Sequence, residues 1–163
     1  MSPFRLPGKI EKDLRLVRKH WASLRRAGNE MPFWDDVKLA ALPELAGTML
    51  LIDAFEKPER FRFSIIGRAL TERYGKDPTS QFTNEVEPRS PFDYITSQCS
   101  ATAESRAATY YQHDESGDRG SVKPQSYARI LLPLWGEGSV RMLFGAVAWT
   151  SADANAQERE RRQ

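Results

Sequence analysis

The stretch that decides the fold is FRFSIIGRALTERYG, residues 61–75. Its first half alternates Phe61, Phe63 and Ile65 with Arg and Ser, which predicts a half-buried strand whose apolar side chains share one face. After a glycine the apolar residues take up helical spacing, and Gly75 stands where glycine ends a helix. The stretch therefore predicts a strand that passes into a short helix, an arrangement that can form the wall of a pocket.

Similar signals place further elements on both sides of this stretch. Runs rich in β-branched, aromatic and aliphatic residues predict strands at 48–55, 106–112, 122–135 and 139–150. Polar or glycine-rich turns are expected at 56–59, 114–120 and 136–138. Short helices are expected at 34–45 and 92–103. This order predicts an α+β domain with a five-stranded antiparallel sheet and a helical cover on one face.

An amphipathic helix is predicted before these elements, at residues 9–27. Its apolar residues recur at spacings of 4, 3, 4 and 3 and fall in a stripe about 80° wide. They are Ile10, Leu14, Val17, Trp21 and Leu24. Such a stripe either packs on the domain's own sheet or pairs with a second subunit as in a coiled coil. We expect the second, a homodimer through these five side chains.

The charge of the chain is unevenly distributed. Residues 1–30 contain eight Lys or Arg and three Asp or Glu, whereas the other 133 residues contain 16 basic and 19 acidic side chains. A basic helix indicates contact with nucleic acid or another anionic surface, or it is simply the solvated face of an amphipathic helix. A nucleic-acid-binding module that uses this helix is therefore an alternative function.

Length and composition favour one domain. The sequence divides into a lead-in at 1–8, the domain with its N-terminal helix at 9–150, and a polar tail at 151–163. The longest apolar run is far shorter than the ~20 residues that span a membrane, and no secretory signal is expected. The single cysteine, Cys99, fits a reducing cytoplasm, where we place the protein.

Three stretches resemble PAS_5, a family of small bacterial PAS-like proteins. They are MPFWDDVKLAALPELAGTMLLIDAF (31–55), FRFSIIGRALTERYGKDPTSQF (61–82) and ARILLPLWGEGSVRMLFGAV (128–147). The residues that match the family's pattern are Phe63, Gly67, Leu70, Glu72, Tyr74 and Gly75, with Leu132, Pro133, Leu134 and Gly138 in the last stretch. The chain departs from the family where Ser80 follows Thr79, a place usually held by glycine.

The resemblance implies a non-enzymatic sensor that binds a small molecule or a signalling protein between its sheet and its helices. It does not name the ligand. The sequence argues against flavin, because Cys99 lacks the Asn-Cys-Arg motif of flavin photosensors. It also argues against haem, because neither His20 nor His113 is placed as an axial ligand.

No catalytic constellation or metal-ligand spacing is recognisable, so neither an enzyme nor a metal site is expected. The candidate pocket residues combine aromatic, aliphatic and polar side chains, as ligand sites do. They are Phe61, Phe63, Ile65, Tyr74, Phe92, Ile95, Tyr127, Arg129 and Leu131. A half-buried Arg129 could clamp a carboxylate or phosphate. The alternative is that the aromatic residues are plain core and Arg129 is an exposed or ion-paired residue of the sheet.

Overall fold

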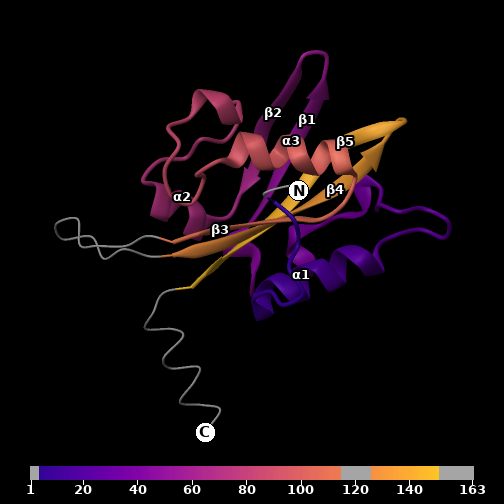
Figure 1. Ribbon diagram of the computed structural model, residues 1–163, viewed down its shortest axis with the longest axis horizontal. Coiled ribbons are helices and arrows are strands. Elements are labelled where there is room, and N and C mark those ends of the chain that lie inside the picture. The colour runs from indigo at the N-terminus through magenta and orange to yellow at the C-terminus, as the bar shows by residue number, and fades with distance from the viewer. Residues whose placement is uncertain (1–3, 115–125, 151–163) are drawn as a thin grey trace, which may run out of the picture.

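The chain forms one antiparallel sheet with helices packed against it in a computed structural model that describes residues 4–114 and 126–150 (Figure 1). The α-helices are α1 (Lys12–Ser23), α2 (Arg68–Tyr74) and α3 (Ile95–Ser105). The strands are β1 (Met49–Glu56), β2 (Glu59–Ile66), β3 (Thr109–His113), β4 (Tyr127–Gly136) and β5 (Ser139–Trp149). Single turns of 3-10 helix are η1 (Trp34–Asp36), η2 (Leu39–Ala41), η3 (Ala46–Thr48) and η4 (Thr83–Glu85).

The strand order of the sheet is β2-β1-β5-β4-β3, and every neighbouring pair is antiparallel. The β1–β2 hairpin and the three later strands are joined by the pairing of β1 with β5. The turn between β4 and β5 places Glu137 and Gly138 at φ of 50° and 87°, the left-handed conformations that a tight two-residue hairpin requires. The predicted α+β class and five-stranded antiparallel sheet are confirmed.

Backbone hydrogen bonds to irregular segments occupy part of both sheet edges. At β2, Phe63 N–H donates to Gln81 O at 3.0 Å, and Phe63 O accepts from Ser80 N–H at 2.8 Å. At β3, Tyr110 N–H donates to Phe4 O at 2.9 Å. These bonds satisfy edge groups that would otherwise be open to another strand.

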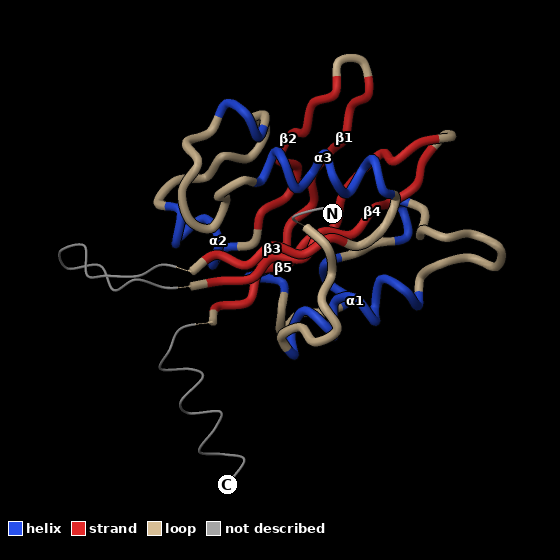
Figure 2. The backbone as a smooth tube through the Cα atoms, viewed as in Figure 1, coloured by secondary structure: helices blue, strands red, loops and turns tan. Residues whose placement is uncertain are grey.

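Two neighbouring residues of β3 show that α1 and α3 lie on opposite faces of the sheet. Thr109 Oγ1 accepts a hydrogen bond from Gln98 Nε2 of α3 at 3.1 Å, while the Tyr110 hydroxyl donates to Glu11 Oε1, just before α1, at 2.8 Å. Successive side chains of a strand point to opposite faces, and the tube view agrees with this arrangement (Figure 2). The sequence predicted a helical cover on one face, and the N-terminal helix covers the other.

The apolar stripe of the N-terminal helix packs on the chain's own sheet. Leu14 and Val17 are fully buried, and Trp21 Nε1 donates to Pro133 O of β4 at 2.9 Å. Ile10 and Leu24, the other two stripe residues, are partly buried against the same core. A second copy therefore cannot reach Leu14 or Val17 in this conformation. The structure takes the alternative that the sequence left open, and a homodimer stays a prediction that needs another interface.

Ile65 lies on the face opposite to the one predicted, because β2 contains a β-bulge. Leu51 pairs with Ile65, but the next residue, Ile52, pairs with Phe63, so Ser64 is an extra residue in β2. One extra residue reverses the side-chain alternation beyond it. Phe63 is accordingly buried, whereas Ile65 is 48% exposed.

The expected helix at 34–45 is replaced by η1 and η2. Between them Val37 and Lys38 are extended, with ψ of 123° and 120°. The Val37 side chain is buried in the core. Its packing thus overrides a helical preference that was weak in any case.

The third helix begins and ends at residues in the left-handed conformation. Tyr94 has φ 56° just before α3, and Arg106 has φ 53° just after it. The helix therefore starts three residues later than the predicted 92–103, and β3 begins at Thr109 rather than at 106. The predicted turn at 114–120, the start of the strand predicted at 122–135, the first residues of the lead-in and the tail at 151–163 lie outside the described residues.

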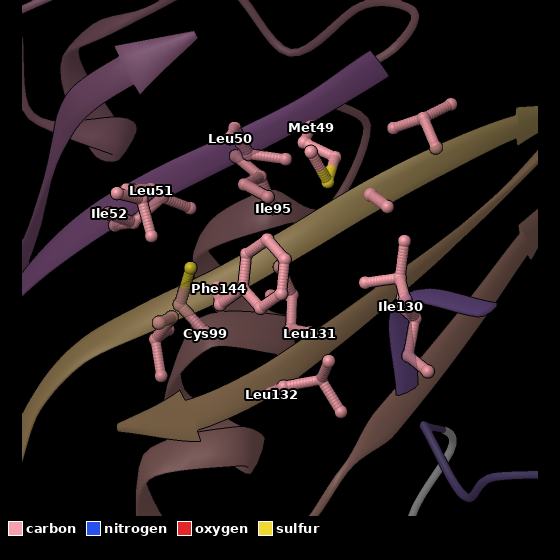
Figure 3. Packing of buried hydrophobic residues seen from close by; sticks show 14 of the residues in the cluster. Met49, Leu50, Leu51, Ile52, Ile95, Cys99, Ile130, Leu131, Leu132 and Phe144 are labelled. Carbon is pink, nitrogen blue, oxygen red and sulfur yellow. The ribbon is translucent and has the colours of Figure 1, made fainter. Parts of the chain in front are cut away.

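Side chains of β1, β4, β5 and α3 pack together in the core, as Figure 3 shows.

Leu14 and Leu16 of α1 provide a matched test of the packing of the N-terminal helix on the sheet, because Leu14 is fully buried and Leu16 is 45% exposed. We expect Leu14→Ala to lower the free energy of unfolding by about 2–5 kcal/mol, and Leu16→Ala to change it by less than about 0.5 kcal/mol. Urea unfolding measures both. Equal effects would contradict the packing of the stripe on the sheet.

Candidate ligand site

Eight of the nine predicted pocket residues come together, but as packed core. Phe61, Phe63, Tyr74, Phe92, Ile95, Tyr127, Arg129 and Leu131 are all buried. The aromatic rings among them fill the space between the sheet and the helices. The ring centroid of Phe92 lies 4.9 Å from that of Phe63 and 5.1 Å from that of Tyr74. Ile65 is excluded from the group by the bulge.

Arg129 of β4 is the centre of this region, and it is completely buried. Its Nε–H donates to Gln98 Oε1 at 2.7 Å, while its two terminal nitrogens donate to the carbonyl oxygens of Pro91 and Asp93, each at 2.8 Å. The guanidinium also lies over the ring of Tyr111, 5.0 Å from its centroid. Each guanidinium nitrogen thus has a partner, as a buried charge requires.

Gln98 of α3 links this arginine to the neighbouring strand. Its amide nitrogen donates to Thr109 Oγ1 at 3.1 Å and to the backbone carbonyl of Arg129 at 3.2 Å. Thr102, one turn further along α3, lies 2.6 Å from Thr109 Oγ1 and donates to Gln98 O at 2.7 Å. The buried polar groups of α3 therefore bond to β3 and β4, which fixes how the helix sits on the sheet.

Asp93 connects the arginine to a second polar group at the end of the sheet. Its carboxylate accepts from the Tyr127 hydroxyl at 2.8 Å and lies 3.7 Å from Nε2 of His113. Nδ1 of His113 is 2.8 Å from the Tyr111 hydroxyl, and the imidazole stacks on the Tyr127 ring. The Asp93 carboxylate, the His113 imidazole and the Tyr111 phenol thus follow one another in contact. The Tyr111 phenol is not activated as a nucleophile, because its pKa is raised.

Burial explains why these groups are unreactive. It raises the pKa of Tyr111 to about 12, with a smaller contribution from the Asp93 carboxylate in the same direction. It also raises the pKa of Tyr127 and lowers that of Arg129. The pKa of the Cys99 thiol is raised to about 12, again mainly by burial. A thiol that stays protonated at neutral pH is a poor nucleophile, so Cys99 behaves as a small core residue.

The predicted anion clamp at Arg129 is therefore not accessible in this structure. The guanidinium has no exposed surface, and the bonds to Gln98, Pro91 and Asp93 use all three of its nitrogens. Its role here is to join the loop before α3 to β4. The interpretation of the aromatic residues as core is the one that the packing supports.

A cleft of about 300 Å³ lies elsewhere, where the end of α3 meets the β1–β2 hairpin. Apolar and aromatic side chains form much of its lining, namely Ala54, Phe55, Phe61, Ala103 and Val140. Charged residues complete it, namely Glu56, Lys57, Glu59, Glu104 and Arg106. The lining is thus about half apolar and half charged, which suits a small molecule that has both an apolar part and a polar part.

Two of the charged residues are held by contacts of their own. Glu59 Oε1 accepts from the Ser100 hydroxyl of α3 at 2.7 Å, which ties the hairpin to the helix beside the cleft. Arg106 ends α3 in the left-handed conformation, and its guanidinium lies 5.9 Å from the Trp135 ring centroid. The lining of the cleft is therefore shaped by the end of the helix.

The sequence identified only Phe61 among the residues that line this cleft. Ala54 and Ala103 carry no chemical signal. Glu56, Lys57 and Glu59 belong to a predicted turn, Glu104 follows the predicted helix, and Arg106 was expected to begin a strand. The cleft depends on where α3 ends relative to the β1–β2 hairpin. That position is set by tertiary packing, so no local sequence pattern predicts it.

The chain matches no protein-family model, and no curated protein matches it. The resemblance to PAS_5 thus has no support from a family match. None of the helices in the described part of the chain is long and apolar enough to cross a membrane. Residues 4–114 and 126–150 also contain no group of three or more His, Cys, Asp or Glu side chains arranged to hold a metal ion.

Replacing Arg129 tests its structural role. We expect Arg129→Met to lower the free energy of unfolding by about 2–5 kcal/mol, because three buried acceptors lose their donor. Arg62→Met is the matched control: Arg62 pairs with Asp53 at 3.1 Å but is partly exposed, so its loss costs about 1 kcal/mol or less. Guanidinium chloride unfolding gives both values. An Arg129 variant as stable as the Arg62 variant would contradict the assignment.

The raised pKa of Tyr111 predicts a pH dependence. The unfolded chain begins to release phenol protons near pH 10, whereas folded Tyr111 holds its proton until about pH 12. The folded state therefore binds more protons in this window, and its stability falls as the pH rises from about 10 to about 12. Urea unfolding at a series of pH values measures the slope. Tyr111→Phe should make the slope less steep without abolishing it, because burial also raises the pKa of Tyr110 and Tyr127; an unchanged slope would contradict the assignment.

Proposed function

We propose that the protein is a non-enzymatic, PAS-like sensory domain that binds a small molecule in the cleft between the end of α3 and the β1–β2 hairpin. The observation that carries this proposal is the cleft of about 300 Å³ with its apolar and charged lining. Its volume lies at the lower end of the range of ligand sites, about 300–1,000 Å³. The ligand would be a small molecule with an apolar body and a polar end.

The arrangement of the sheet supports the PAS-like part of the proposal. One hairpin precedes the helical segment, three strands follow it, and β1 pairs with β5 to unite them. This is the two-plus-three layout that the sequence resemblance implied. The buried polar network around Arg129 supports a role for α3 as a firmly seated helix rather than as a mobile lid.

The position of the cleft offers a route from ligand to signal. Glu59 of β2, which lines the cleft, is hydrogen-bonded to Ser100 of α3. A ligand that enters between these elements would alter the relation of the hairpin to the helix. A partner protein that reads the hairpin would then sense the bound state.

Filling the cleft tests the proposal. Ala103 lines it, whereas Ala107 is exposed just beyond α3 and does not. We expect Ala103→Trp to weaken the binding of small fluorinated aromatic fragments at least about tenfold, a loss of about 1.4 kcal/mol, while Ala107→Trp binds as wild type. Ligand-observed fluorine NMR measures the affinities. The proposal fails if wild type binds no fragment, or if the Ala103 variant binds them equally well.

Native mass spectrometry of the purified protein provides an independent check. A copurified small molecule should be present on wild type and on Ala107→Trp, and absent or reduced on Ala103→Trp. The same spectra report the oligomeric state, and they should show whether the predicted homodimer forms.

A further inference from the structure

The outer surface of α1 carries a cluster of basic side chains that the proposed function does not use. We call Lys12, Arg15, Arg18 and Lys19 the basic face; all four are exposed. At 100° per residue they fall within an arc of about 120° on the helix. They lie away from the buried stripe of Leu14, Val17 and Trp21 or along its border.

No side chain of the described residues neutralises this face. Some other basic residues do have acidic partners, such as Arg26 with Asp36 at 2.9 Å and Arg68 with Glu72 at 3.0 Å. Single exposed cations such as Lys57 and Lys76 have none among the described residues, but they do not cluster. Within residues 4–114 and 126–150, the four side chains of the basic face form no ion pair.

Like charges are also neighbours within the basic face. Arg15 has Lys12 and Arg18 three residues away and Lys19 four residues away, spacings at which like charges destabilise a helix. An anionic partner would relieve this repulsion.

The nearest acidic side chains do not offset the face. The Tyr110 hydroxyl lies 2.8 and 3.2 Å from the two carboxylate oxygens of Glu11 and donates its proton to this carboxylate, which is thereby directed to β3. Asp13 falls on the opposite flank of the helix, about 100° from Lys12. The bond from Trp21 to Pro133 fixes α1 about its axis, so the basic face is held outward as a rigid surface.

We propose that the basic face of α1 binds the phosphate backbone of double-stranded nucleic acid without reading its sequence. Four unpaired cations on one helix, about 18 Å long, complement the closely spaced phosphates of a duplex. Binding to single strands generally adds aromatic side chains on which bases stack, and Trp21 is buried rather than exposed on this face. A helix that lies in a membrane needs an apolar face, and Leu16 is the one large apolar residue of α1 that is exposed.

Salt dependence is the decisive measurement. Fluorescence anisotropy with a labelled 20-base-pair DNA should give a log K against log salt slope of about −3.6 for four phosphate contacts. Arg18→Gln should reduce the steepness by about 1. Arg15→Glu with Lys19→Glu should abolish detectable binding.

A double variant at the start of α2 and just beyond its end controls for net charge. Arg68→Glu with Lys76→Glu changes the charge by the same amount at two exposed positions outside α1, and we expect it to bind almost as wild type. Circular dichroism establishes that both double variants are folded. Equal loss of binding in the two would overturn the assignment to α1, because it would indicate a non-specific effect of net charge.

Vesicles that contain phosphatidylserine distinguish a membrane from a nucleic acid. Binding to DNA but not to vesicles at the same salt concentration supports the proposal. Binding to vesicles alone, or no binding to DNA at low salt, overturns it. The fragment-binding test of the cleft, with Ala103→Trp and Ala107→Trp, does not depend on this outcome. The two proposals can therefore fail separately.

Discussion

The burial of one positive charge constrains much of this structure. Arg129 has no exposed surface, and a guanidinium in such a place must have all its nitrogens bonded. Pro91 and Asp93 supply backbone carbonyls, and Gln98 supplies its amide oxygen. The loop before α3 must therefore present its carbonyls inward, and the helix must begin where Gln98 can reach β4. The left-handed Tyr94, between the loop and the helix, is compatible with this path because its φ orients the peptide that carries the Asp93 carbonyl.

The sheet could be predicted from the sequence because its signals are local. The strands were predicted from alternating apolar residues. Their antiparallel pairing was predicted from the polar turn after β1 and the glycine turn after β4. Ile65 was misplaced because a bulge adds one residue without any mark in the alternation. The stripe on α1 was assigned to a dimer because a narrow apolar surface has the same sequence whether it meets its own sheet or another subunit. The burial of Leu14 and Val17 and the hydrogen bond from Trp21 to Pro133 distinguish the two.

The candidate site was harder to predict than the fold. The sequence predicted a pocket lined by aromatic residues and an arginine. These residues do come together, but they pack against one another and leave no accessible site at Arg129. The space that remains lies between the end of α3 and the β1–β2 hairpin, and of the residues that line it the sequence had identified only Phe61. The two faces of the sheet also have different surroundings: α3 seals one with a polar network, while α1 covers the other and turns its charge outward. A binding cleft and a basic surface can thus belong to one small domain without overlapping.

The covered edges of the sheet determine how another molecule can approach this domain. Phe4 bonds to β3 at one edge, and the segment that contains Ser80 and Gln81 bonds to β2 at the other. Peptides that recognise their partners by extending a sheet need a free edge with unsatisfied backbone groups. Here an incoming strand that pairs with Phe63 of β2 or Tyr110 of β3 would first have to displace the protein's own chain. Recognition through side chains, at the hairpin end or along α1, requires no such exchange.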